Sequence, residues 1–272
     1  MGKMKVQENN QRITQTICFA NNKGGSGKTT ACANLGFELA AAGKRVLLID
    51  GDMQLNLSLS FFDEVRVLDM AARKQNLYYA VREKRDLAAY IVPTPYENLE
   101  LVPSSTLMSQ IEYELFPMLR REYVLKGCLR QVYESGRYDY VLIDAPPTLG
   151  AWVINILCAS DYVIVPVEAS PWGLFGLANM FDFLQEMREL TEARVMGVLI
   201  SKVDERKNYY RQTREILKEY ANIHVFDVCI HVDSSVEWAQ DGSVPVAVYR
   251  KGTRSAKEFR ELAKEVMSNG SR

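Results

Sequence analysis

Short apolar runs alternate with longer amphipathic segments along most of the chain. The runs are rich in Val, Ile and Leu, as expected of buried strands, and cover residues 16–20, 45–49, 99–102, 140–143, 162–167 and 195–200. Apolar positions recur at helical spacing between them, over residues 29–42, 123–134, 174–190 and 209–221, and again over 256–267. Strands that alternate with helices predict an α/β fold with a mostly parallel, twisted sheet and helices on both faces.

Composition narrows the class of protein further. The 272 residues are 47% hydrophobic and 25% charged, which excludes a disordered, fibrous or membrane-embedded protein. The formal net charge is -1, so contact with nucleic acid would need a local basic patch. The five cysteines include no C-x-x-C pair and favour buried thiols in a reducing, cytoplasmic setting. Residues 1–14 predict a poorly ordered N-terminal extension ahead of a single domain over residues 15–272.

The strongest chemical signal is a glycine-rich segment between the first predicted strand and the first predicted helix. It reads NNKGGSGKTT over residues 21–30. Glycines let backbone N–H groups approach phosphate oxygens, and the start of a helix adds partial positive charge. A lysine neutralises the β and γ phosphates in such a loop, and the hydroxyl that follows it binds Mg²⁺. The residues expected to hold phosphate are Lys23, Gly24, Gly25, Ser26, Gly27, Lys28, Thr29 and Thr30.

This segment departs from the usual phosphate-loop pattern. Asn22 occupies the position of the first glycine, and an additional lysine, Lys23, precedes Lys28. Residues 23–30 resemble the deviant Walker A motif of the ParA/MinD group of P-loop ATPases. The resemblance implies a single P-loop NTPase domain that binds Mg-ATP and forms an ATP-dependent, face-to-face homodimer. It also implies that Lys23 reaches across the dimer to the phosphates of the partner.

Two aspartates follow the second predicted strand, in the segment VLLIDGDMQLN at residues 46–56. The carboxyl end of a parallel strand faces the ligand crevice, although the spacing alone is equally compatible with a solvated turn. The segment resembles the ParA-like pattern D-x-D-x-Q-x-N, with Met53 in place of the usual Pro. The resemblance implies that Asp52 orients the attacking water, with Lys23 and Lys28 as the other catalytic residues. Asp50 is a further candidate for the metal.

Another apolar run ends in an aspartate, in the segment YVLIDAPP at residues 140–147. This is the Walker B arrangement, in which the carboxylate supports Mg²⁺ through a water. The expected magnesium residues are therefore Thr29 and Asp144. Weaker matches to the same family occur at residues 163–168 and 201–204, and the resemblance extends from about residue 13 to about residue 266.

Members of the ParA/MinD group differ in what the ATP-bound dimer binds. ParA-like proteins bind DNA without sequence preference, whereas MinD-like proteins bind a membrane through a C-terminal amphipathic helix. The last predicted helix has one apolar stripe suited to the core and mixed charges opposite, which favours DNA over a membrane. Arg206 matches a DNA-contacting arginine of the ParA-like proteins, whereas Asp233 lies near the place of a second one.

Basic residues gather in the C-terminal half of the chain, and the DNA-binding set expected from them is Arg206, Lys207, Arg250 and Lys251. A solvated charged face is the alternative explanation of this cluster.

The motifs together predict a cytoplasmic, nucleoid-associated ATPase of weak intrinsic activity that uses ATP and Mg²⁺. By resemblance, it would partition or position a plasmid, another mobile element or a chromosome. A ParB-like partner or another adaptor protein would stimulate its hydrolysis. A MinD-like positioning ATPase that acts on a membrane or protein surface stays open as an alternative. A nucleotide-gated adaptor and a transcriptional corepressor are two further alternatives.

Overall fold

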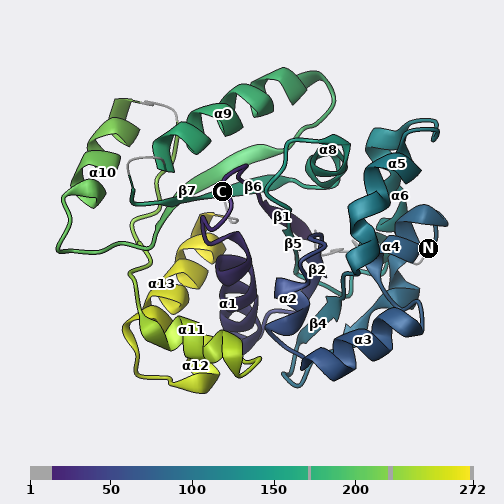
Figure 1. The fold of residues 1–272 in the computed structure, drawn as a ribbon, viewed down its shortest axis with the longest axis horizontal. Helices are drawn as coiled ribbons and strands as arrows, with labels where there is room; N and C mark the ends of the chain where they lie inside the picture. The colour runs from purple at the N-terminus through teal and green to yellow at the C-terminus, as the bar shows by residue number, and fades with distance from the viewer. Residues whose placement is uncertain (1–13, 171–172, 220–222, 270–272) are drawn as a thin grey trace, which may run out of the picture.

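The computed structural model describes residues 14–170, 173–219 and 223–269 (Figure 1). The predicted N-terminal extension lies outside these residues except for Thr14, so it stays a prediction. The same holds for the last two residues of the helix predicted over residues 209–221. Within the described ranges, no helix combines the length and the apolar character needed to cross a membrane.

A seven-stranded sheet forms the centre of the molecule, in the order β3-β4-β2-β5-β1-β6-β7. Only β3 runs antiparallel to its neighbour, β4. The strand bounds are β1 (Gln15–Phe19), β2 (Val46–Asp50), β3 (Val92–Pro93), β4 (Leu99–Val102), β5 (Tyr140–Asp144), β6 (Tyr162–Glu168) and β7 (Arg194–Ser201). The α/β fold with a mostly parallel sheet is therefore confirmed.

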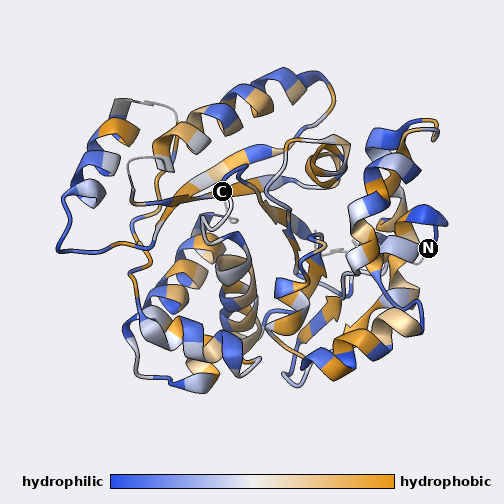
Figure 2. Cartoon of the chain, in the orientation of Figure 1, coloured by the Kyte–Doolittle hydropathy of each residue, from blue (hydrophilic) through white to orange (hydrophobic). Residues whose placement is uncertain are grey.

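Helices cover both faces of the sheet, because successive strand residues point to opposite sides. On β2, Leu48 belongs to one core, whereas Leu47 and Ile49 belong to the other. Figure 2 shows apolar residues concentrated on the strands. The core of Leu48 is covered by α1 (Lys28–Ala41), α2 (Asn56–Leu59), α3 (Glu64–Ala72), α11 (Ser234–Asp241), α12 (Val246–Tyr249) and α13 (Arg254–Asn269).

The opposite core is covered by a second group of helices. Its members are α4 (Leu77–Arg82), α5 (Ile111–Leu115), α6 (Val124–Cys128), α7 (Arg130–Glu134), α8 (Ala151–Cys158) and α9 (Gly173–Glu186). The outlying helix α10 (Tyr209–Glu219), on the left in Figure 1, adds Leu217 to this core. Short 3-10 turns complete the elements, as η1 (Leu87–Tyr90), η2 (Thr106–Gln110), η3 (Arg121–Tyr123) and η4 (Met187–Glu189).

Most differences from the sequence-based elements lie in short segments. The helix predicted over residues 123–134 is interrupted at Leu129, between α6 and α7, and the one predicted over 174–190 ends in the turn η4. The apolar pattern missed several helices of four to nine residues, which span too few turns to show a clear period. It also missed β3, a two-residue edge strand that contains Pro93.

The long helix α1 is bonded to the C-terminal helices. The Gln240 side chain donates a hydrogen bond to Thr30 Oγ1 at 3.1 Å, and Arg260 of α13 pairs with Glu38 at 3.2 Å. The backbone N–H of Val246 donates to Asn34 Oδ1 at 2.9 Å. The helix that begins in the predicted phosphate loop is therefore in direct contact with α11, α12 and α13.

Candidate active site

The predicted phosphate loop connects β1 to α1 at the carboxyl edge of the sheet. Gly25 and Gly27 have φ angles of 74° and 93°, in the left-handed region that glycine adopts without steric cost. Ser201, at the end of β7, donates a hydrogen bond to the Ser26 carbonyl at 2.6 Å. A side chain at Gly27 would meet this serine, since an added Cβ would lie 3.3 Å from Ser201 Oγ. The two glycines thus let the loop fold tightly against the end of β7.

The structure brings Thr29 and Asp144, the two residues expected to organise magnesium, into direct contact. Thr29 Oγ1 donates to Asp144 Oδ2 at 2.7 Å, and Asp144 Oδ1 is buried with no hydrogen-bond partner among the described residues. Burial raises the pKa of Asp144 well above its usual value, with nearby Asp50 adding to the rise. A buried carboxylate oxygen without a partner, next to a threonine hydroxyl, fits a magnesium-water cluster. These two residues would hold the metal and its waters.

Lys28 lies within the electric field of Asp144 and Asp52. It is only 6% exposed, and its Nζ donates to the Lys23 carbonyl at 3.2 Å. Burial lowers the pKa of Lys28, whereas the charges of Asp144 and Asp52 raise it. A nucleotide phosphate here would supply further negative charge to a cation that the protein has already removed from water.

The two aspartates after β2 have different surroundings. Asp50 is fully buried: Oδ2 accepts from the Ser58 N–H at 2.8 Å and hydroxyl at 2.6 Å, and Oδ1 accepts from the Asp52 N–H at 3.2 Å. Burial raises the pKa of Asp50 to about 6. Asp52 lines the cavity, and its Oδ1 accepts from the Gln54 N–H at 3.1 Å. The position of Asp52 is consistent with a role toward the nucleotide, whereas both Asp50 oxygens are engaged within the protein.

A cavity of about 730 Å³ opens beside these residues. One wall is the phosphate loop, and the opposite wall comes from the end of β7 and from residues 230–240. Its volume is in the range of small-molecule sites in proteins. Residues 201–204 matched the family only weakly, and none of His231, Val236 and Gln240 was placed in the site from the sequence.

Lys23 makes contacts that the sequence did not predict. Its Nζ pairs with Glu168 at the end of β6 and donates to Ser170 Oγ at 3.0 Å. Partial burial raises the pKa of the Glu168 carboxyl, but the hydrogen bond and charge of Lys23 outweigh it and hold that pKa below its usual value, with Lys202 adding to the effect. The lysine expected to act on a partner is therefore paired within its own chain.

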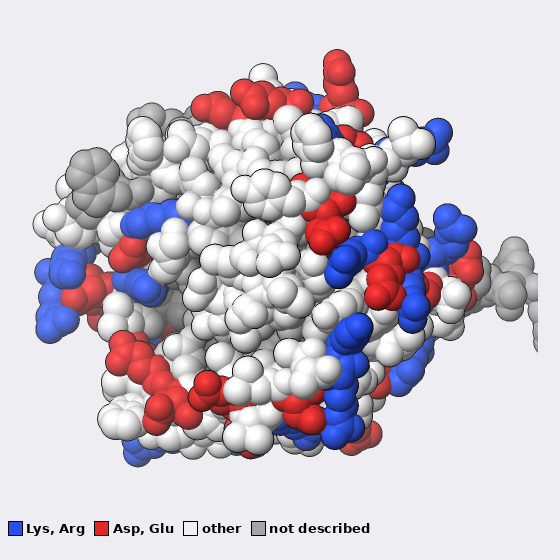
Figure 3. All heavy atoms as spheres, turned by 45° about the vertical axis from the view of Figure 1, so that its right-hand side comes forward, with Lys and Arg blue, Asp and Glu red and all other residues white. Residues whose placement is uncertain are grey.

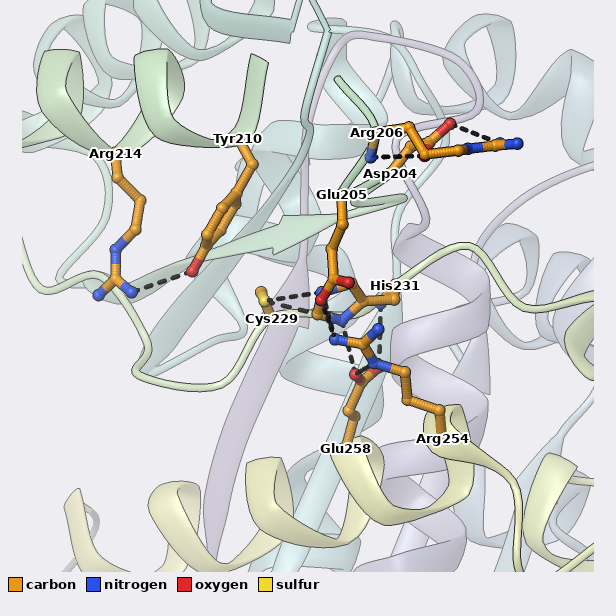
Figure 4. Close-up of polar contacts among 9 residues, drawn as sticks. All are labelled: Asp204, Glu205, Arg206, Tyr210, Arg214, Cys229, His231, Arg254 and Glu258. Carbon is orange, nitrogen blue, oxygen red and sulfur yellow. Dashed lines mark hydrogen bonds and ion pairs between the residues drawn. The ribbon is translucent and has the colours of Figure 1, made fainter. Parts of the chain in front are cut away.

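One ion pair joins the two predicted basic segments, and residues 204–207 and 250–254 are together here called the basic corner. Arg254 of α13 pairs with Glu205 at 2.7 Å and with Glu258 at 2.9 Å (Figure 4). Its Nη2 lies 2.7 Å from His231 Nε2, so the basic corner also contacts the cavity wall. Of the predicted DNA residues, Arg250 and Lys251 are exposed in the loop between α12 and α13.

Arg206 and Lys207 lie beside an acidic neighbour. Arg206 forms two 2.8 Å hydrogen bonds with Asp204, and Lys207 lies 3.9 Å from the same carboxylate. The hydrogen bond from Arg206 is the main cause that lowers the pKa of Asp204 to about 2. Asp233 caps α11 by accepting from the Ser235 N–H at 2.9 Å, and it also accepts from Ser255 at 2.8 Å. Asp233 thus joins the start of α11 to α13, and it also lines the cavity.

Charges of both signs are mixed elsewhere on the surface. On the face shown in Figure 3, Lys and Arg alternate with Asp and Glu around a broad area without charged side chains. This agrees with the formal net charge of -1. Electrostatic attraction to a polyanion would therefore depend on local groups such as the basic corner.

The site and its position in the fold define the class of the protein. A loop of left-handed glycines at the start of a helix, with buried aspartates at the ends of two adjacent parallel strands, is the site of a P-loop nucleoside triphosphatase.

Comparison with known proteins identifies the family. A family model described as an AAA domain matches residues 14–196. The chain is 35% identical to the sporulation initiation inhibitor protein Soj of Bacillus subtilis, over 93% of this chain and 98% of Soj. It is 32% identical to the chromosome partitioning protein ParA of Caulobacter vibrioides, over 93% of this chain and 94% of ParA. The chain therefore belongs to the ParA-like partition ATPases of this AAA-domain family.

A solved structure supports the same chemistry. Cobyrinic acid a,c-diamide synthase of Mycobacterium smegmatis, with a bound ATP analog and magnesium, superposes with a TM-score of 0.82. It is 26% identical, and the match covers 95% of this chain and 96% of the synthase. The reaction of the present protein is the hydrolysis of ATP, and its cofactors are ATP and Mg²⁺.

Proposed function

We propose that this ATPase is a nucleotide-dependent switch that partitions a plasmid, another mobile element or a chromosome. In this proposal Mg-ATP drives formation of a homodimer in the cytoplasm, and the dimer binds nucleoid DNA without sequence preference. A ParB-like partner then stimulates hydrolysis, which dissolves the dimer and releases the DNA. The partition role of relatives such as ParA supports the proposal.

One structural observation carries the DNA half of this proposal. His231 lines the nucleotide cavity, and the same side chain lies 2.6 Å from Glu258 and 2.7 Å from Arg254. Arg254 and Glu258 start the helix that follows Arg250 and Lys251. A movement of His231 on nucleotide binding would therefore act directly on Arg254 of the basic corner.

Each site residue has a role in the proposed hydrolysis. Lys28 and the backbone of residues 24–30 hold the phosphates, while Thr29 and Asp144 organise Mg²⁺ through hydroxyl and water contacts. Asp52, which lines the cavity, orients the attacking water and stabilises the positive charge that develops on it. Bound magnesium would neutralise negative charge that develops on the phosphates.

Lys23 has the role of a trans-acting residue in the proposed dimer. To reach the phosphates of a partner, its ammonium must leave Glu168 and Ser170. A phosphate group, with more negative charge than a carboxylate, is a competitive partner for that cation. ATP binding by two facing subunits would thus replace a contact within each chain by a contact between chains.

The proposal is tested by DNA binding of the Asp52→Ala variant. We expect hydrolysis to fall about 100-fold or more because the water loses its orienting carboxylate. The variant should therefore accumulate an ATP-bound dimer that binds random-sequence duplex DNA in a salt-sensitive manner. The measurement is fluorescence anisotropy of labelled DNA with ATP, ADP or no nucleotide, at low and moderate salt.

The control is Asp182→Ala, which removes an exposed aspartate on α9 and should behave as the parent protein. Absence of DNA binding in every nucleotide state would overturn the DNA half of the proposal. Normal hydrolysis by Asp52→Ala would overturn the assignment of Asp52.

A further inference from the structure

We propose that Trp152 is a positioning residue for ATP hydrolysis, because its indole N–H fixes the peptide that precedes Asp52. Trp152 lies in the first turn of α8, is 2% exposed, and donates from Nε1 to the Gly51 carbonyl at 2.9 Å. The role rests on the water-orienting function proposed above for Asp52. Trp152 itself does not line the nucleotide cavity.

The turn that carries Asp52 is held at Gly51 from both sides. The Gly51 N–H donates to the Asp144 carbonyl at 3.0 Å, while the Gly51 carbonyl accepts from Trp152. That carbonyl belongs to the planar peptide that joins Gly51 to Asp52. Fixing the plane of this peptide restrains the backbone where the chain enters Asp52. The hydrogen bond from the Gln54 N–H to Asp52 Oδ1 then holds the carboxylate on that restrained backbone.

Gly51 and Trp152 are matched in shape as well. A Cβ added at Gly51 would lie 2.6 Å from the Asp144 carbonyl oxygen, 3.2 Å from Ile156 Cδ1 and 3.5 Å from Trp152 Nε1. The close approach of β5 and α8 therefore requires glycine at this position. The absence of a side chain there leaves the backbone carbonyl accessible to the indole.

The rest of the turn needs such a restraint. Leu55 has a φ of 62°, and a left-handed conformation of this kind is unfavourable for a non-glycine residue. Met53, 42% exposed in the middle of the turn, does not restrict its own φ as a proline would. A strained turn keeps one conformation only when surrounding contacts determine it. Trp152 supplies one of these contacts.

A small displacement of Asp52 would be costly for hydrolysis, since a shift of about 1 Å in a catalytic group can reduce a rate about 100-fold. Ground-state binding of ATP depends on the phosphate loop, which Trp152 does not contact through any hydrogen bond described here. Loss of the indole donor should therefore reduce kcat and leave ATP affinity unchanged. This combination separates a positioning role from a general loss of folding.

The test is Trp152→Phe in the full chain, which keeps an aromatic ring and removes the donor. We expect kcat in single-turnover Mg-ATP hydrolysis to fall about tenfold, with unchanged ATP affinity. Hydrogen exchange of the amides of residues 52–55 should also become faster. The matched control is Ile156→Val, which trims the same packing contact beside Gly51 and keeps the indole donor.

A second pair of variants covers a Trp152→Phe protein that folds poorly. Trp152→Gln places an N–H donor the same number of bonds from the backbone as the indole N–H, and Trp152→Leu has no donor. Faster hydrolysis by the Gln variant than by the Leu variant would support the role. Parent-like hydrolysis and exchange in Trp152→Phe, or equal losses in Trp152→Phe and Ile156→Val, would overturn it. Asp52→Asn, assayed in parallel, shows separately whether the Asp52 assignment holds.

Discussion

The nucleotide cavity and the basic corner both depend on charged residues but place them in opposite environments. In the cavity, Lys28 is 6% exposed and Asp144 fully buried, and each is held by hydrogen bonds of the loop and sheet. In the basic corner, the Arg206 side chain is 88% exposed and already paired with its neighbour Asp204. Charges taken out of water interact strongly, whereas exposed ion pairs contribute little.

This difference shows when the role of a charged residue can be inferred from the sequence alone. A lysine in a glycine loop has its surroundings specified by the backbone, so its role follows from the local pattern. The charge that an exposed arginine presents depends on nearby carboxylates, here Asp204 for Arg206 in its loop and Glu205 for Arg254 at the start of α13. DNA would have to compete with those carboxylates for both arginines.

The largest effect is expected in the cavity, for Lys28→Ala. The substitution removes the buried cation and leaves the Asp144 charge without it, so ATP affinity should fall about 100-fold or more. Titration calorimetry with Mg-ATP measures the change. Lys126→Ala, at an exposed position of α6, is the control and should keep parent affinity. Equal ATP affinities of the parent, Lys28→Ala and Lys126→Ala would contradict the contrast between the cavity and the basic corner.

An intermediate effect is expected in the basic corner, and its sign depends on which member of one ion pair is removed. Arg206→Ala should weaken DNA binding in the ATP state and reduce the slope of log K against log salt by about 1. Asp204→Asn should tighten binding about two- to fivefold, because it releases Arg206 and Lys207 from a carboxylate. Salt titrations of DNA affinity in the Asp52→Ala background measure both. Weaker binding by Asp204→Asn would contradict this account.

The smallest effect concerns Glu38, which joins the helix of the cavity to the helix of the basic corner. Burial raises the pKa of Glu38 above its usual 4.5, although Arg260 opposes the rise. The folded protein therefore holds this proton at higher pH than the unfolded chain does. The resulting stability is full below pH 4.5 and is lost as the pH rises through the raised folded pKa.

The Glu38→Gln variant should lose this dependence on pH. Its melting temperature relative to the parent should increase by about 2 °C or more between acidic and neutral pH, as measured by calorimetry. Glu261→Gln, on the exposed side of α13, is the control and should follow the parent curve. If the melting temperatures of Glu38→Gln and the parent change in parallel with pH, the Glu38 carboxylate titrates alike in the folded and unfolded states, contrary to this prediction.

The parts of the fold that could be predicted are those with a long or strongly apolar pattern. The strand ending in Asp144 and the helix starting at Lys28 carry continuous signals, and the order of these elements places Thr29 beside Asp144. The sequence predicted that the turn after β2 is catalytic, but it did not predict the hydrogen bonds that hold this turn. Trp152 lies about 100 residues from Gly51 along the chain, and no local pattern encodes a contact between them.

Other features could not be predicted because they depend on tertiary contacts. The pairing of Lys23 with Glu168 follows from the adjacency of β1 and β6, which only the assembled sheet establishes. The helix α8 is apolar along nearly its whole length, so a search for amphipathic period finds little there.

The hydrogen bonds from Gln240 to Thr30 and from Val246 to Asn34 have a thermodynamic consequence for the proposed switch. They connect the first turns of the phosphate-loop helix with the segment that leads into the basic corner. If ATP binding increases the affinity for DNA by some factor through this connection, DNA must increase the affinity for ATP by the same factor. The nucleoid would then act as a reservoir that retains the nucleotide on the protein, and ATP would be lost most readily from molecules that have left the DNA.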